Sequence, residues 1–289
     1  MITLREFYQF YSPRLGLIRS LLAFGSLITL AFNPFSDLFP YELWLIKKNK
    51  PETLFDPLNI FYIGSYETGT LIYFASIIAL IFVIIGYIPQ VTCILHCWIA
   101  YSIYYGTLIV EGGDQITCIL SLLLIPICLA DKRINHWSTK NKFKYSLNKY
   151  LNYFLFTILC FIQLQIAFLY LDAGIEKCKV DEWVDGSAIY YWSNDTVFGA
   201  SGFLEGILNF LFQSKIVTFV LNWLVILLEL TLFSALFMNK ANKDTLFIFA
   251  LIFHLLIFLV HGLPAFSFAM TASLLLLLKP IKHHVYETA

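Results

Sequence analysis

Long apolar runs recur along the whole chain, and they limit what it can fold into. A helix of about 20 residues crosses the roughly 30 Å hydrocarbon layer of a bilayer. In lipid, the backbone polar groups must bond within helices or closed barrels. Because 59% of the residues are hydrophobic and only 13% are charged, a soluble core could not bury them all. The sequence predicts an all-α polytopic membrane bundle of about eight transmembrane helices in a single domain, residues 1–289, with runs at 14–33, 68–87, 90–110, 115–130, 150–171, 216–238, 244–262 and 264–280.

The distribution of lysine and arginine between these runs indicates the orientation of the chain. With the N-terminus inside, the inner segments hold twelve of these residues and the outer segments hold six. Because cytoplasmic loops carry the excess of positive charge, we expect both termini inside. The formal net charge is zero and no basic patch stands out, so the composition predicts no nucleic-acid partner.

Three polar segments fall on the predicted outer side of the membrane. They are Glu111–Gln115, which includes Asp114, the segment around Lys177, and His261–Gly262. These segments could converge on one pocket. The alternative is structural: short turns need Gly and Asp, and Lys177 could be an anchor at the membrane surface that pairs with a neighbouring carboxylate.

A few polar residues lie inside the apolar runs, where an ionisable group is costly. Arg19 and Glu229 are both placed in the inner or middle part of the bilayer by the helical rise. We therefore expect them to form a structural ion pair that offsets part of the desolvation cost of each. His254 is either a satisfied core residue or a group that lines a pocket.

The six cysteines do not have the spacing of a metal site. No CxxC pair and no HExxH sequence is present, so we predict no metal. Small apolar cysteines are common in helix packing. Cys178 differs because it lies beside Lys177 on the predicted outer side, where it could be oxidised or pair with another protein; the alternative is a free, inert cysteine.

The segment AFLYLDAGIEKCKVDEWVDGSAIYYW resembles the membrane domain of the HTTM family, which includes vitamin K-dependent gamma-glutamyl carboxylase. The shared pattern is Tyr, then Ala-Gly-x-x-Lys, then Trp-x-x-Gly, here Tyr170, Ala173, Gly174, Lys177, Trp183 and Gly186. The run VILLELT around Glu229 and the run FHLLIFLVHGLPAFSFAM, which contains His254, are also similar. The resemblance implies that Lys177 corresponds to the active-site base of the carboxylase.

Over nearly the whole chain, the sequence is similar to the SdpB family of bacterial HTTM proteins. The segments IVEGGDQITCILSLLLIPICLADKRINHW, DEWVDGSAIYYWSNDTVFGA and RSLLAFGSLITLAFN carry this similarity. The family implies a multi-pass protein of the bacterial plasma membrane that helps to produce a secreted antimicrobial peptide toxin. Its implied partners are the toxin precursor, a protein from the same operon and membrane lipid. About nine residues follow the last apolar run, without the extramembrane domain of the carboxylase, so carboxylation does not carry over directly.

Two classes of function follow from the sequence, with immunity to the toxin as a weaker third. The first is a binding factor in toxin maturation. The second is an enzyme that acts on the precursor at the outer face, either by a carboxylase-like modification with a quinol cofactor or by a thiol reaction through Cys178; the residues themselves indicate no cofactor. A base needs the neutral amine of Lys177, which burial favours and neighbouring carboxylates oppose. The candidate catalytic residues are Lys177, His254 and His261, and the candidate substrate-binding residues are Asp114, Gln115, Trp183 and Gly186.

Overall fold

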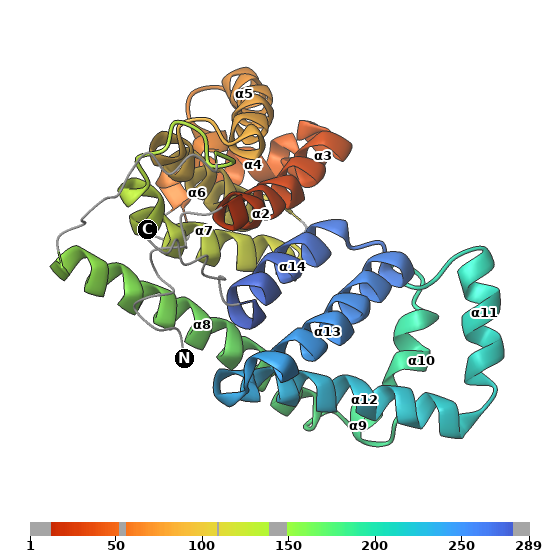
Figure 1. Cartoon of the computed structure of the whole chain (residues 1–289). Helices are drawn as coiled ribbons and strands as arrows, with labels where there is room; N and C mark the ends of the chain where they lie inside the picture. The colour runs from red at the N-terminus through yellow and green to blue at the C-terminus, as the bar shows by residue number, and fades with distance from the viewer. Residues whose placement is uncertain (1–12, 52–55, 109, 139–148, 280–289) are drawn as a thin grey trace. The chain divides into compact units, whose positions relative to one another are not determined.

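The computed structural model describes residues 13–51, 56–108, 110–138 and 149–279, and the described chain is helical (Figure 1). It divides into two compact units. The N-terminal unit contains the described residues up to 158 together with 264–272, and the C-terminal unit contains 159–263 and 273–279. The single domain expected from the sequence stays a prediction.

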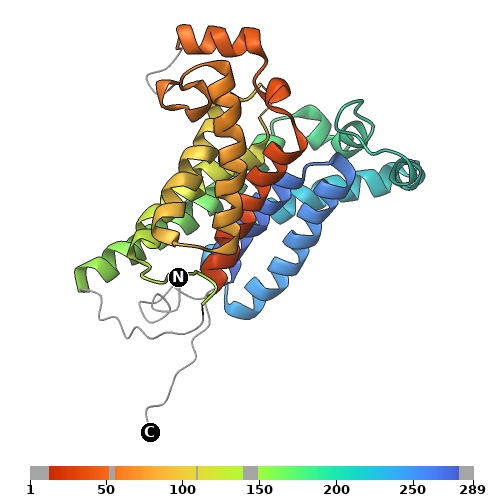
Figure 2. The ribbon, with the colours of Figure 1, turned by 90° about the horizontal axis from the view of Figure 1, so that it is seen from above.

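Four helices form the body of the N-terminal unit, and they lie side by side in both views (Figures 1 and 2). α6 packs along α7 and α2 packs along α5. The short helices that follow α2 close one end with buried aromatic side chains, among them Phe35, Phe39 and Phe61. The elements of this unit are α2 (Pro13–Phe32), α3 (Phe35–Leu38), α4 (Tyr41–Asn49), η1 (Asp56–Leu58), η2 (Ile60–Tyr62), α5 (Tyr66–Ile85), α6 (Pro89–Gly106) and α7 (Gly112–Ala130).

The C-terminal unit is built around α12, which contacts the short helices α9, α10 and α11. Two helices, α8 (Lys149–Lys177) and α14 (Pro264–Leu278), contribute residues to both units. The other elements are α9 (Asp181–Val184), α10 (Ala188–Ser193), α11 (Phe203–Phe212), α12 (Lys215–Ser234), η3 (Ala235–Phe237) and α13 (Lys240–His261).

Each of the eight predicted runs corresponds to a helix among the described residues, and six of these helices are long and apolar enough to cross a membrane. α6 and α14 are not among these six. α6 includes the polar residues Gln90, Thr92 and His96, and α14 has only 15 residues. The finding supports a polytopic helical membrane protein with six candidate spans rather than the expected eight.

The surfaces of the long helices fit a lipid environment. Large apolar side chains are exposed along α5, α12 and α13, for example Leu71, Ile216 and Phe249. Apolar surface of this extent is a mark of contact with lipid or with another protein. The predicted orientation, with both termini inside, stays a prediction, and part of the lysine and arginine count on which it rests lies outside the described residues.

Candidate functional site

The last turns of α8 approach α12 closely because residue 174 is a glycine. A Cβ atom built at Gly174 would lie 2.8 Å from Cδ2 of Leu230 on α12, which is closer than carbon atoms approach without displacement. Tyr170, Gly174 and Lys177 recur at spacings of four and three, so they share one face of α8. The glycine therefore lets α12 approach the face that also carries Lys177.

At this contact Lys177 forms an ion pair with Glu229, the residue before Leu230. Nζ of Lys177 donates to Oε1 of Glu229 at 2.8 Å, and the two side chains are 22% and 8% exposed. Nζ also donates to the carbonyl oxygen of Ala173 at 3.4 Å and lies 5.2 Å from the ring centroid of Trp183. The distance of 5.2 Å to the Trp183 ring is within the range of cation–π attraction. All three contacts stabilise a positive charge at Nζ.

The pairing of Glu229 corrects the ion pair with Arg19 that the sequence predicted. Arg19 instead donates from Nη1 to Nδ1 of His136 at 2.9 Å and from Nη2 to Oγ1 of Thr92 at 2.9 Å. The depth of Arg19 and Glu229 in the bilayer, counted from the helix ends, allowed the two side chains to meet. Depth does not determine which face of a helix is turned toward which neighbour. The rotation of α12 turns Glu229 toward α8.

The pair also relates the depth of Lys177 to that of α12. Lys177 is the last residue of α8, yet its partner lies 14 residues beyond the start of α12, a helical rise of about 21 Å. Both residues belong to candidate membrane spans, Tyr153–Lys177 and Lys215–Phe237. Lys177 therefore lies beside the second half of α12, and its location on the outer side stays a prediction.

His254 joins the same face of α8 through Tyr170. Nε2 of His254, on α13, lies 3.0 Å from Oη of Tyr170, and both side chains are 1% exposed. Tyr170 shares its face of α8 with Lys177, whose partner is Glu229. The structure thus brings two candidate catalytic residues, Lys177 and His254, into one line of polar groups within the C-terminal unit.

The segment after Lys177 is held against the first half of α12 by Asn222. Nδ2 of Asn222 donates to the carbonyl oxygen of Trp183 at 2.6 Å, and its Oδ1 accepts from the backbone N–H of Ile189 at 3.3 Å. Gly186 has a φ of +86°, and a Cβ there would lie 2.5 Å from Cδ2 of Phe219. The Trp-x-x-Gly pattern is therefore a docking element for α12. The sequence reading missed Asn222, although an amide in an apolar run was the signal that could have found it.

The remaining predicted site residues lie elsewhere. Nδ1 of His261 donates to the carbonyl oxygen of Phe198 at 2.8 Å, so this histidine supports the loop before α11. Asp114 belongs to the N-terminal unit and caps α7, since its Oδ2 accepts from the backbone N–H of Glu111 at 3.3 Å. Gln115 is exposed. A common pocket of these residues with Lys177 stays a prediction.

A buried polar cluster around His136 occupies the N-terminal unit. His136 is 0% exposed, and Cβ atoms at Gly16 and Gly86 would lie 2.6 Å and 2.3 Å from its Cδ2. Because a guanidinium only donates, Nδ1 of His136 must accept from Arg19, which fixes a neutral ring with its proton on Nε2. Burial and the positive charges of Arg19 and Arg133 together lower the pKa of His136 to about 3. These contacts explain the conformation of the segment after α7 without requiring a ligand.

The cysteines remain thiols. Cys93 and Cys128 are buried neighbours on α6 and α7, whereas Cys178 is exposed. Among the residues that the structure describes, no group of three or more His, Cys, Asp or Glu side chains could hold a metal ion.

The long apolar helices, the exposed apolar surface and the partly buried ion pair define a polytopic helical membrane protein. The chain belongs to the HTTM family, because the HTTM domain model matches residues 13–281. It is 32% identical over 287 residues to "Sporulation-delaying protein SdpB" of Bacillus subtilis (strain 168), covering 98% of this chain and 87% of that protein. It is also 32% identical over 286 residues to "Uncharacterized protein YitO" of the same organism, covering 94% of this chain and 87% of that protein. No solved structure matches. The family resemblance read from the segment around Lys177 is confirmed.

Proposed function

We propose that this protein takes part in the maturation of a secreted antimicrobial peptide toxin from its precursor. It acts with a partner protein from the same operon, at the outer face of the bacterial plasma membrane. The similarity to a sporulation-delaying protein over 98% of the chain supports the toxin system. The ion pair between Lys177 and Glu229, next to Trp183, is the observation that carries the choice of site.

The site has the groups needed to hold a polar part of a peptide. An ammonium group has three donors, and two of those of Lys177 are used by Glu229 and Ala173. Oε2 of Glu229 is buried without a hydrogen-bond partner among the described residues. A buried polar atom without a partner costs free energy. A peptide N–H or hydroxyl that bonded Oε2 after a local movement had opened access to it would remove this cost, while the third donor of Lys177 would bond a carbonyl or carboxylate of the same peptide.

A second candidate is a carboxylase-like reaction in which Lys177 is the base. The specific observation in its favour is the proximity of Glu229, since transfer of a proton from Nζ to the carboxylate would leave a neutral amine. Low exposure of Glu229 favours a neutral pair over a charged one, because desolvation penalises both charges. The intact ion pair opposes this reaction, so we place it second.

The carboxylase resemblance also suggests a quinol as a cofactor. The buried Oε2 of Glu229 is an acceptor that fits a quinol hydroxyl. When bound, a quinol would supply reducing equivalents. The protein's own contribution would be the hydroxyl acceptor at Glu229 and the proton held at Lys177.

Replacement of Lys177 distinguishes the two candidates. The wild type, Lys177→Arg and Lys177→Ala are expressed with the precursor and the partner protein, their abundance in the membrane is matched, and the intact mass of the secreted peptide is measured. A binding role predicts normal peptide from Lys177→Arg, because arginine keeps the charge and can bond both oxygens of Glu229, and less peptide from Lys177→Ala. A base predicts unprocessed or mass-shifted peptide from both.

Lys179→Ala is the matched control, because Lys179 lies two residues away and pairs with exposed Glu176 rather than with α12. It should leave the peptide unchanged. If deletion of the whole protein leaves the amount and the mass of the secreted peptide unchanged, the proposed role in maturation is wrong.

A further inference from the structure

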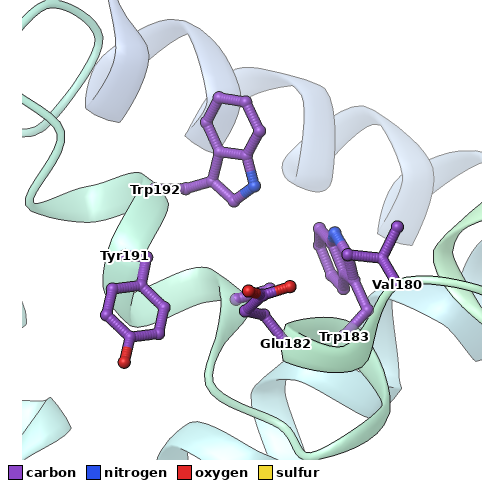
Figure 3. A pocket seen from close by; sticks show the side chains of 6 residues that line it. Val180, Glu182, Trp183, Tyr191 and Trp192 are labelled. Carbon is purple, nitrogen blue, oxygen red and sulfur yellow. The ribbon is translucent and has the colours of Figure 1, made fainter.

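A cavity of about 400 Å³ lies beside the ion pair, within the C-terminal unit. Its size is in the range of pockets that bind small ligands. Trp183 lines it and also contacts Nζ of Lys177, so this one residue belongs to both features. The lining residues are Val180, Glu182, Trp183, Ala188, Tyr191 and Trp192 (Figure 3).

The lining combines aromatic rings with one carboxylate. Figure 3 shows the carboxylate of Glu182 between Tyr191 and Trp183, with the indole of Trp192 across from it. The side chain of Glu182 forms no hydrogen bond or ion pair with the described residues. Its backbone carbonyl accepts a hydrogen bond from the backbone N–H of Ser187 at 2.9 Å. Within the described residues, the carboxylate is thus available to a ligand. Aromatic faces attract cations through their quadrupole, and a nearby carboxylate adds to that attraction.

The chain segment that contains the cavity residues is negatively charged, like Glu182 itself. Residues 170–195 contain six carboxylates and two lysines. Both lysines are engaged, Lys177 with Glu229 and Lys179 with Glu176. The segment that carries the cavity residues therefore has a formal charge of −4, which favours cations over anions.

The excess of carboxylates also favours one source of the cation, a lysine or arginine side chain, over another, a lipid headgroup. A phosphatidylcholine headgroup carries its quaternary ammonium next to a phosphate, and an anion here would face the surplus of carboxylates with both neighbouring lysines already paired. A lysine or arginine side chain brings no such anion. Val180 and Ala188 offer apolar wall against which the methylene stem of either side chain can pack.

We propose that this cavity binds a lysine or arginine side chain of a peptide, with the cationic group beside Glu182 and the rings of Trp183, Tyr191 and Trp192. The identification of that peptide as the toxin precursor rests on the proposed function. The binding of a cationic side chain does not, and it can be tested without precursor or partner. Through Trp183, the cavity would hold a basic residue of the peptide next to the ion pair of Lys177.

The test uses the full chain, purified in dodecyl maltoside, which carries no charge. Binding of N-acetyl-lysine methylamide and N-acetyl-arginine methylamide is measured by saturation-transfer difference NMR, with N-acetyl-norleucine methylamide as the neutral analogue. Glu182→Gln removes the charge and keeps the shape. We expect it to weaken binding of both cations about fivefold or more, and the neutral analogue to bind the wild type about tenfold more weakly than lysine.

Asp181→Asn is the matched control, since Asp181 is exposed on the same helical turn and does not line the cavity. It should change the affinity less than about twofold. Trp192→Leu, which keeps an apolar side chain but removes the ring, should weaken binding as Glu182→Gln does. Equal unfolding temperatures of variants and wild type show that the fold is kept.

The proposal is overturned if Glu182→Gln binds as the wild type does, or if Asp181→Asn loses as much affinity as Glu182→Gln, since the effect is then one of general charge. Equal binding of the norleucine analogue would also overturn it, because the cavity would then be merely apolar. A parallel titration with short-chain phosphatidylcholine identifies the lipid outcome: if that lipid, and neither amino-acid cation, binds in a manner sensitive to Glu182→Gln, the ligand is a headgroup and the proposal is wrong.

Discussion

The ion pair between Lys177 and Glu229 should contribute to stability unequally through its two partners, because their burial differs. In Lys177→Met the carboxylate of Glu229, 8% exposed in the intact protein, loses its cation. Breaking a fully buried pair costs about 3–5 kcal/mol, whereas exposed pairs contribute about 0–1 kcal/mol. Lys177 is 22% exposed, so we expect an intermediate loss of about 2–3 kcal/mol in the free energy of unfolding.

The reverse substitution should cost less. In Glu229→Gln the remaining lysine can extend its flexible stem toward water, so we expect a loss of about 1–2 kcal/mol. The double variant Lys177→Met with Glu229→Gln leaves no unpaired charge. Its loss should therefore be smaller than the sum of the two single losses by about 1–2 kcal/mol, which is the coupling energy of the pair.

The assay is reversible unfolding of the purified protein in mixed micelles by titration with sodium dodecyl sulphate, monitored by circular dichroism. Lys179→Met is the control, because its pair with Glu176 is 61% and 56% exposed, and it should change stability by less than about 1 kcal/mol. Additive losses in the double variant, or a loss in Lys177→Met no larger than in the control, would refute the reasoning.

Three further predictions concern packing, protonation and orientation. Gly174→Ala should be less stable than Gly206→Ala by about 1 kcal/mol or more. Both substitutions gain about the same helix propensity, but only the Cβ at residue 174 must displace a side chain, because it would lie 2.8 Å from Cδ2 of Leu230, whereas no atom lies within 4 Å of a Cβ at residue 206. Equal unfolding midpoints of the two variants would contradict the close approach of α8 and α12. His136, with its pKa lowered to about 3, is neutral in the fold, so its contribution to stability is complete above pH 6.5 and is lost as the pH falls from 6.5 toward 3, by up to about 1.4 kcal/mol per pH unit. Unfolding midpoints at pH 7 and pH 5 test this, and a His136→Gln variant with the same pH dependence as wild type would disprove it. Cys178 is exposed and is predicted on the outer side from the distribution of lysine and arginine, so a membrane-impermeant maleimide should label the wild type in intact cells and fail to label Cys178→Ser; labelling seen only in inverted vesicles would place this segment inside.

The sequence determined the helices well, because hydropathy is a local property. The run at 14–33 became α2, Pro13–Phe32, and the run at 216–238 became α12 followed by η3, Lys215–Phe237. The Ala-Gly-x-x-Lys pattern also located the face of α8 that carries Lys177. Both results follow from residues close together in the chain.

The partners of the buried charges were decided only by the tertiary structure. Lys177 and Glu229 are 52 residues apart, and Arg19 and His136 are 117 apart. The sequence predicted that Arg19 would meet Glu229, from depth alone. Depth follows from counting residues along each helix, but a partner also depends on the rotation of each helix and on which helices are adjacent.

In helices that face lipid, the sequence does not show the rotation of each helix or which helices are adjacent. In a soluble protein, the polar face of a helix shows which side is buried. α5, α12 and α13 are apolar on their exposed surfaces as well as their buried ones, so their composition does not mark the packed side. The sequence by itself therefore determined that the chain crosses a membrane as helices and which family motif it carries. Only the tertiary structure decided that Gly174 admits Leu230, that Glu229 pairs with Lys177 and that Asn222 holds Trp183, because each depends on helix rotation and close approach, which hydropathy does not encode.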